Sequence, residues 1–205
     1  MKIAIDGPAA AGKTTLGKRL AQALGFLFVP TGAMYRAAAL AFQRGLRLED
    51  IDITVTESGK ILLNGEDVTA LLSNPELDEL SSVLSADSRV RERLVALQRK
   101  IAEGRDVVME GRDIGTVVLP DAELKIFLWA TLEERARRRQ REQGGRLEEI
   151  LEAIRRRDER DSTRACSPLK PAPDAVFLDT TDKTPEEVLK EVLKMVEERR
   201  ARMDR

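Results

Sequence analysis

The chain has 205 residues, 42% of them hydrophobic, and its 35 basic and 36 acidic side chains nearly cancel. This size suffices for one α/β domain with small insertions, and the charge balance argues against a general affinity for nucleic acid or anionic membranes. A single cysteine, Cys166, and no histidine exclude an intramolecular disulfide, a multi-cysteine zinc site and the most common general base, so any metal is expected to be Mg²⁺ on oxygen ligands. The first 25 residues are charged and lack a long apolar core, so we expect a cytoplasmic protein without a membrane partner.

The chain begins with a β-prone run at residues 2–5, after which Leu16, Leu20 and Leu24 recur every fourth residue. This pattern predicts a strand followed by an amphipathic helix. The sequence GPAAAGKTT joins the two, with two glycines, a lysine and a threonine at the spacing of a phosphate-binding P-loop. The alternative is a surface turn, but strand, loop and helix all agree with the motif.

In a P-loop the backbone N–H groups converge on a nucleotide phosphate at the positive end of the helix. Lys13 would bridge the phosphates, and the Thr14 hydroxyl would ligate Mg²⁺. Ala10 occupies a place often filled by glycine in related loops, which raises the question whether this residue needs a positive φ. The predicted ATP-binding residues are Gly7, Pro8, Ala9, Ala10, Ala11, Gly12, Lys13, Thr14 and Thr15.

Four further apolar runs predict buried strands at residues 26–29, 106–109, 124–129 and 175–178. Strands that alternate with helical stretches indicate a doubly wound parallel sheet, that is, an α/β fold of five parallel strands flanked by helices. Capping-box spacing at Thr131 with Glu134, and at Thr184 with Glu187, marks two helix starts. The last helix is expected to bury one apolar face.

About 75 residues separate the second and third predicted strands, far more than a crossover needs. Within this insertion, residues 53–63 alternate in polarity around Ser58-Gly59, and Asn64-Gly65 follows. These are hairpin signals, so we expect a small antiparallel sheet on a helical arm.

Residues 131–164 are rich in arginine and carry Gly144-Gly145 in the middle. They predict a helix, a hinge and a second helix. A solvated helical pair with Glu–Arg contacts is one interpretation, but next to a P-loop a phosphate-binding lid is favoured, because arginine presents permanently charged planar donors. We therefore expect a core (residues 1–32, 101–130 and 165–205), an arm (33–100) and a lid (131–164).

Several classes of nucleoside triphosphate protein share the P-loop. A signalling GTPase would need an Asn-Lys-x-Asp element, which is lacking, and a motor or transport ATPase would usually show a strand that ends in Asp-Glu, which no predicted strand does. The remaining class is a small phosphotransferase whose acceptor binds in the arm.

Four segments together carry a family resemblance: IDGPAAAGKTT, TGAMYR (31–36), EGRDIGTVVLPDAELKIFL (110–128) and RDERDSTRACSPLKPAPDAVFLDTT (157–181). They resemble the bacterial cytidylate kinases, which are nucleoside monophosphate kinases, over nearly the whole chain. The resemblance implies Mg²⁺-dependent transfer of the ATP γ-phosphoryl group to CMP or dCMP, giving ADP and CDP or dCDP, in pyrimidine metabolism. We expect a monomer whose partners are ATP and CMP or dCMP.

The resemblance also implies roles for single residues. Arg36 looks like the arginine that grips the acceptor phosphate, Arg112 like the one that reads the pyrimidine edge, and Asp161 like the acceptor of sugar hydroxyl hydrogen bonds. Two positions depart from the family pattern: Thr31 stands where serine is expected and keeps the hydroxyl, and Trp129 stands where aspartate is common, which puts a polar contribution there in doubt. The predicted CMP-binding residues are Thr31, Arg36, Ser82, Arg112, Asp161 and Arg164, and the predicted catalytic residues are Lys13, Arg157 and Arg160.

Structural explanations stay open for two of these places: Arg112 and Asp113 could form a buried ion pair, and Tyr35 could simply pack in the core.

No dedicated general base is required for phosphoryl transfer, because the second phosphate pKa of a nucleoside monophosphate is about 6. A uridylate or shikimate-type kinase and a non-catalytic ATP-binding switch remain alternative functions. Water is a competing acceptor in phosphoryl transfer, so a lid is expected to close before transfer, with Gly144-Gly145 as its hinge region.

Overall fold

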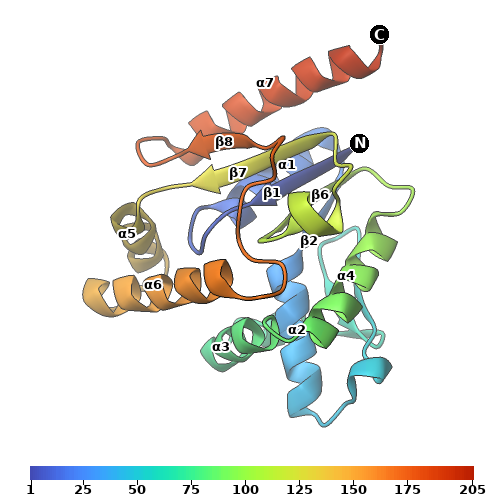
Figure 1. The fold of residues 1–205 in the computed structure, drawn as a ribbon, viewed down its shortest axis with the longest axis vertical. Helices are drawn as coiled ribbons and strands as arrows, with labels where there is room; N and C mark the ends of the chain where they lie inside the picture. The colour runs from blue at the N-terminus through green and yellow to red at the C-terminus, as the bar shows by residue number, and fades with distance from the viewer.

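The computed structural model describes residues 1–205, and its centre is a five-stranded parallel sheet (Figure 1). The strand order is β2-β6-β1-β7-β8. The predicted α/β fold and all five strands are confirmed, with most ends shifted by one or two residues. The strands are β1 (Lys2–Asp6), β2 (Leu27–Pro30), β6 (Val107–Gly111), β7 (Leu124–Trp129) and β8 (Val176–Asp179).

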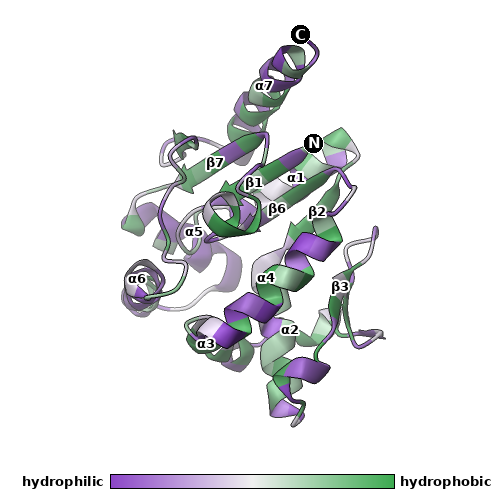
Figure 2. Cartoon of the chain, turned by 45° about the vertical axis from the view of Figure 1, so that its right-hand side comes forward, coloured by the Kyte–Doolittle hydropathy of each residue, from purple (hydrophilic) through white to green (hydrophobic).

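Both faces of the sheet are covered because alternate strand residues point to opposite sides. Ile3 and Ile5 of β1 pack in one core with α1 (Lys13–Leu24) and α7 (Pro185–Met203), whereas Ala4 belongs to a second core with α2 (Thr31–Gln43) and α4 (Ser88–Ala102). Figure 2 shows α4 with alternating hydrophobic and hydrophilic bands, as expected for a helix that buries one face. None of the helices combines the length and apolar character needed to cross a bilayer.

The predicted hairpin insertion is confirmed as a three-stranded antiparallel sheet between α2 and α3 (Pro75–Leu84). Its strands are β3 (Ile53–Val55), β4 (Ile61–Leu63) and β5 (Glu66–Asp67). Asn64 and Gly65 both adopt positive φ, which the tight turn between β4 and β5 requires. The apolar side of this small sheet packs against α2. Single helical turns at Leu48–Asp50 and Thr69–Leu71 complete the arm, by which we mean residues 33–100.

Two helices, α5 (Leu132–Gln143) and α6 (Leu147–Thr163), lie beside the carboxyl ends of the strands (Figure 1). They belong to residues 131–164, the segment predicted as a lid, and we use the name lid for this segment. The two predicted helices are confirmed, and Gly144 and Gly145, predicted as a hinge, lie between them with positive φ. The capping box at Thr184 is complete, but that at Thr131 is half formed: its side chain accepts from the Glu134 N–H, while its own N–H donates to Thr181 Oγ1 at 3.1 Å.

The lid packs directly on the P-loop. Ala9 of the loop lies in a small buried cluster with Ala136 of α5 and Ile154 of α6. The Asp158 carboxylate accepts from the Ala9 N–H at 3.2 Å and from the buried Arg135 guanidinium at 2.5 Å, and Arg135 also donates to the Ala9 carbonyl at 3.1 Å. Both backbone polar groups of one loop residue are therefore held by lid side chains.

At the end of β1, Asp6 ties the P-loop strand to a short π-helical turn, Ile114–Val118. Its buried carboxylate accepts from the N–H groups of Ile114 at 2.9 Å and Gly115 at 2.8 Å. Burial raises the pKa of Asp6 to about 6, although the two N–H groups partly oppose that rise.

We predict that Asp6 makes folding stability depend on pH between about 4 and 6. The folded state holds the Asp6 proton up to pH about 6, whereas the unfolded state releases it near pH 3.8, so the free energy of unfolding falls as pH rises through this window. Asp6→Asn removes the titratable carboxyl group and with it this contribution to the pH dependence of stability. Urea unfolding of both proteins at several pH values should show that the wild type loses on the order of 2–3 kcal/mol relative to the variant across the window. Parallel pH profiles would contradict the assignment.

We also predict that Asp158→Asn loosens the lid, because it leaves the buried Arg135 charge without its carboxylate. A loss of about 1–3 kcal/mol is expected in the local stability of α5 and α6, measured by hydrogen exchange. Glu159→Gln, at an exposed neighbour whose side chain forms no hydrogen bond or ion pair, is the control. Equal exchange of the lid amides in both variants would show that Asp158 does not anchor the lid.

Candidate active site

Two adjoining cavities open between the P-loop, the arm and the lid. The large cavity has a volume of about 1090 Å³ and includes P-loop residues 10–15 in its wall, while the small pocket has about 40 Å³ and an almost entirely polar lining. Gly32, Arg112 and Arg157 line both, so the two cavities share a wall. The small pocket is further lined by Thr31, Tyr35, Ser81, Ser82, Ser85, Arg91, Gly111, Asp113, Asp161 and Arg164.

The P-loop has a conformation that its small residues permit. A Cβ atom at Gly7 would lie 2.1 Å from the Leu128 carbonyl oxygen, so no side chain fits there. Ala10 has φ +60°, which answers the question raised by the sequence: the position does adopt a left-handed conformation, at some cost for a residue with a side chain. The Lys13 ammonium is buried and donates to the Pro8 carbonyl at 2.8 Å.

Glu110 is a site residue that the sequence analysis missed. It stands near the end of β6, paired in register with Ile5 of β1, and its carboxylate accepts from the Thr14 hydroxyl at 2.8 Å. The available signal was an acidic residue near the end of a strand beside the P-loop strand; the search for an Asp-Glu pair passed over it. A hydroxyl and a carboxylate are ligands that suit Mg²⁺ held jointly with nucleotide phosphates.

Positive charge is concentrated around the large cavity. Burial, together with the guanidinium groups of Arg112 and Arg157, holds the pKa of Lys13 well below its ordinary value. Burial also lowers the pKa of Arg36 and of Arg139, and Arg157 contributes to both shifts. Cations that lower one another's pKa would each be stabilised by an anion placed between them, so the cavity suits a polyanionic ligand.

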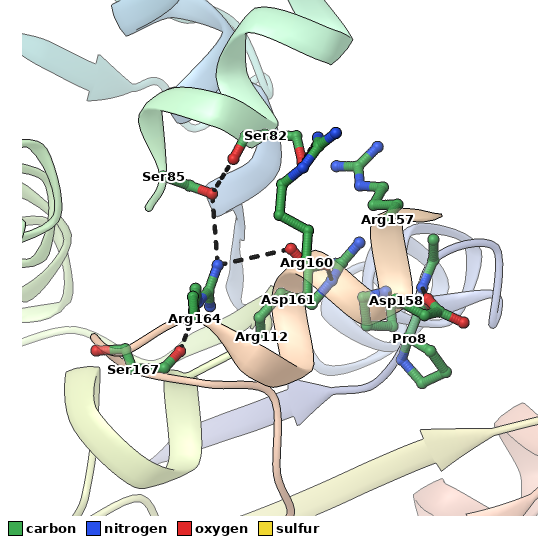
Figure 3. A network of polar contacts seen from close by, with 12 residues as sticks. Pro8, Ser82, Ser85, Arg112, Arg157, Asp158, Arg160, Asp161, Arg164 and Ser167 are labelled. Carbon is green, nitrogen blue, oxygen red and sulfur yellow. Dashed lines mark hydrogen bonds and ion pairs between the residues drawn. The ribbon is translucent and has the colours of Figure 1, made fainter. Parts of the chain in front are cut away.

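Carboxylates from separate segments compensate part of this charge. Arg112 Nε donates to the buried Asp161 at 2.9 Å, and Arg164 lies 3.7 Å from the same carboxylate and 3.4 Å from Ser85 Oγ (Figure 3). Burial alone would raise the pKa of Asp161, but Arg112 and the other nearby arginines outweigh burial and hold it below the ordinary value. Asp161 is therefore an ionised hydrogen-bond acceptor in the wall of the small pocket.

The two predicted catalytic arginines of the lid contact α3 of the arm. Arg157 donates to both carboxylate oxygens of Asp78 at 2.9 Å. Arg160 donates to Ser82 Oγ at 2.7 Å and to Glu79 at 2.9 Å. Both side chains project from α6 on the side of Ser82 (Figure 3). Arg157 lines both cavities, whereas Arg160 lines neither.

A second buried ion pair, between Arg91 and Asp113, also lines the small pocket. Arg91 donates to Asp113 at 2.5 Å and lies over the Tyr35 ring, 5.3 Å from its centroid. The Tyr35 hydroxyl is buried without a hydrogen-bond partner. The pairing of Arg112 with Asp113 considered from the sequence is wrong, because Asp113 pairs with Arg91 while Arg112 pairs with Asp161.

Arg91 was missed by the sequence analysis, although its spacing carried a signal. It stands three residues before Leu94 and four before Val95, both buried, so it lies on the inner face of α4. A charged residue on a buried helix face is uncommon and marks a paired or functional group.

The predicted site residues fall in different places. Thr31, Ser82, Arg112, Asp161 and Arg164 all line the small pocket, whereas Arg36 lines only the large cavity.

Three of the predicted ATP-binding residues lie outside both linings. Gly7, Pro8 and Ala9 are buried beneath the cavity wall. Trp129 also lines neither cavity and packs against Phe177, their ring centroids 6.1 Å apart. Trp129 therefore makes no polar contribution through its side chain here.

Known structures and sequences resemble this chain along almost its whole length. An uncharacterized protein from Eubacterium ventriosum aligns with a TM-score of 0.59 at 13% identity, and shikimate kinase from Bacteroides thetaiotaomicron with 0.52 at 15%; each covers 96% of this chain and is itself 98% covered. These likenesses show the fold alone.

Sequence similarity is more specific. Cytidylate kinase from Caldanaerobacter subterraneus subsp. tengcongensis is 49% identical, covering 96% of this chain and 94% of its own, and that from Geobacillus kaustophilus is 46% identical with 97% of each covered. The cytidylate kinase family model matches residues 3–198. The chain therefore belongs to the cytidylate kinase family.

Proposed function

We propose that this protein transfers the γ-phosphoryl group of ATP to CMP or dCMP, giving ADP and CDP or dCDP, as a cytoplasmic monomer without a nucleic-acid or membrane partner. The observation that carries the proposal is the shared wall: Arg112 and Arg157 belong at once to the P-loop cavity and to a small polar pocket. A phosphate donor and a nucleoside acceptor bound on either side would meet at these two arginines.

ATP would bind with its phosphates on the P-loop amides and on Lys13, which is already buried at the start of α1. Thr14 and Glu110 would hold Mg²⁺ together with phosphate oxygens, and the ion would supply charge neutralisation between the phosphates. The lid arginines would stabilise the charge that spreads over the transferring group. Because the acceptor phosphate is already ionised near neutral pH, no general base is needed.

On the acceptor side, Arg36 would hold the phosphate of CMP, and Asp161 would accept from the sugar hydroxyls. Cytosine offers acceptors at O2 and N3 and an amino donor at N4, so it pairs with one donor group and one acceptor group. Arg91 and Asp113 provide such a combination in the wall of the small pocket. Arg112, expected to read the base, stands on the shared wall and is the competing candidate.

One assay separates this proposal from its alternatives. ADP production with ATP and Mg²⁺ should be measured for CMP, dCMP, UMP, AMP, GMP and shikimate. We expect CMP and dCMP to be phosphorylated most efficiently. Turnover of another acceptor with CMP and dCMP inert would refute the proposal, and ATP binding without any turnover would favour a non-catalytic switch.

We predict that Lys13→Ala lowers kcat far more than it weakens CMP binding, because the ammonium acts on the phosphates as they transfer. A loss of about a hundredfold or more in kcat is expected, with the dissociation constant of CMP changed by less than about threefold. Steady-state kinetics and calorimetry measure the two quantities. An unchanged kcat would contradict the assignment of residues 7–15 as a nucleotide-binding P-loop.

A paired substitution decides which arginine reads the base. Uracil presents an N3–H donor toward a guanidinium, so removing the base-reading arginine should cost CMP about 1–3 kcal/mol and narrow its lead over UMP. Arg112→Met and Arg91→Met are compared by the CMP-to-UMP ratio of kcat/KM, which does not depend on the fraction of folded enzyme. We expect the CMP-to-UMP ratio of kcat/KM to fall in one of the two variants and to stay at the wild-type value in the other. If both keep the wild-type ratio, the base is read by neither residue, and Arg164 and Ser82 are the next candidates.

A further inference from the structure

Asp78, on α3 of the arm, forms ion pairs with two groups that the proposed function assigns to phosphate. One nitrogen of the Arg157 guanidinium donates to both Asp78 oxygens at 2.9 Å, and the Arg36 guanidinium lies 3.8 Å away. All three residues line the large cavity. A phosphate offers the same kind of anionic oxygen to the same donors, so carboxylate and phosphate compete for one position.

The pair is exposed enough to exchange. The side chain of Asp78 is 36% accessible, and those of Arg157 and Arg36 are 20% and 29% accessible. Ion pairs of this exposure change an equilibrium constant only a few-fold. A doubly charged phosphate held by both arginines would therefore outcompete a single carboxylate.

The other acidic residues in the cavity wall have different partners or none. The Glu110 carboxylate accepts from Thr14, and Glu57 pairs with Arg105. Glu142 is paired with no side chain. Asp78 is thus the carboxylate in this wall that spans an arginine of the lid and an arginine of α2 in the arm.

We propose that Asp78 is a positioning residue that competes internally with the acceptor phosphate: its carboxylate holds the guanidinium groups of Arg157 and Arg36 beside α3 and releases them when a nucleoside monophosphate binds. This inference rests on the proposed function. With Arg157 held by Asp78, less positive charge faces the γ-phosphate before the acceptor arrives. Attack by water, which yields ADP, inorganic phosphate and a proton, is then slower than transfer to the acceptor.

Asp78→Asn tests the proposal because it keeps the size and removes the charge. We expect the dissociation constant of CMP, measured by calorimetry without ATP, to fall about threefold to tenfold, while that of cytidine, which lacks the phosphate, stays unchanged. KM for CMP should fall with kcat little affected, and ATP hydrolysis without an acceptor should rise. Asp78→Ser serves as a second variant.

Glu76→Gln is the matched control. It removes one negative charge from the same helix at an exposed position whose side chain forms no hydrogen bond or ion pair, so it should leave CMP binding unchanged. If Asp78→Asn binds CMP no more tightly than the wild type, or more weakly, the carboxylate merely positions Arg157 and the competition is refuted.

Inorganic phosphate separates this inference from the proposed function. Phosphate should raise the thermal midpoint of Asp78→Asn more than that of the wild type, whichever acceptor the enzyme uses. A wild type that phosphorylates CMP, with no gain for CMP or phosphate in Asp78→Asn, would overturn the inference alone. A wild type inert toward CMP would overturn the proposed function, while a phosphate gain in the variant would still support anion competition.

Discussion

The arrangement of this molecule depends on one electrostatic constraint: several cations must stand close together where phosphates are to meet. Two unit charges 4 Å apart interact with about 4 kcal/mol at the effective dielectric constant of a protein surface. Burial lowers the pKa values of Lys13, Arg36 and Arg139, and the neighbouring charge of Arg157 lowers each of them further, so the chain bears part of this repulsion. The sheet supports the cluster because its strands end at one edge, and the P-loop at that edge holds Lys13 in place.

The carboxylates that relieve the repulsion come from three separate segments, and this explains the architecture around the sheet. Glu110 belongs to the core, Asp78 to the arm and Asp161 to the lid. Each lies near a cation of another element, so ion pairs cross the cavity in addition to the apolar contacts between the segments. Pairs with exposed members can exchange for phosphate, whereas the buried pair of Arg112 with Asp161 is costly to break.

The features that could be predicted from the sequence are those determined by patterns of residues close together in the chain. The strands, the P-loop, the hairpin with Asn64-Gly65 and the glycine turn of the lid each depend on residues a few positions apart. Glu110, Arg91 and Asp78 were not identified, because their roles arise from partners distant in sequence: Arg157 and Asp78 are 79 residues apart, and Arg91 and Asp113 are 22. Charge alone did not single them out in a chain that is 35% charged.

The contact between lid and P-loop adds a further consequence. Ala9 has its N–H and its carbonyl both bonded to lid side chains, and the next residue, Ala10, is held at positive φ. The loop conformation that suits a phosphate is therefore stabilised partly by Asp158 and Arg135, which lie outside the loop. Because Arg157 and Asp158 are consecutive residues of α6, and one contacts the arm while the other contacts the P-loop, a displacement of α6 alters the contacts of the P-loop and of the arm together.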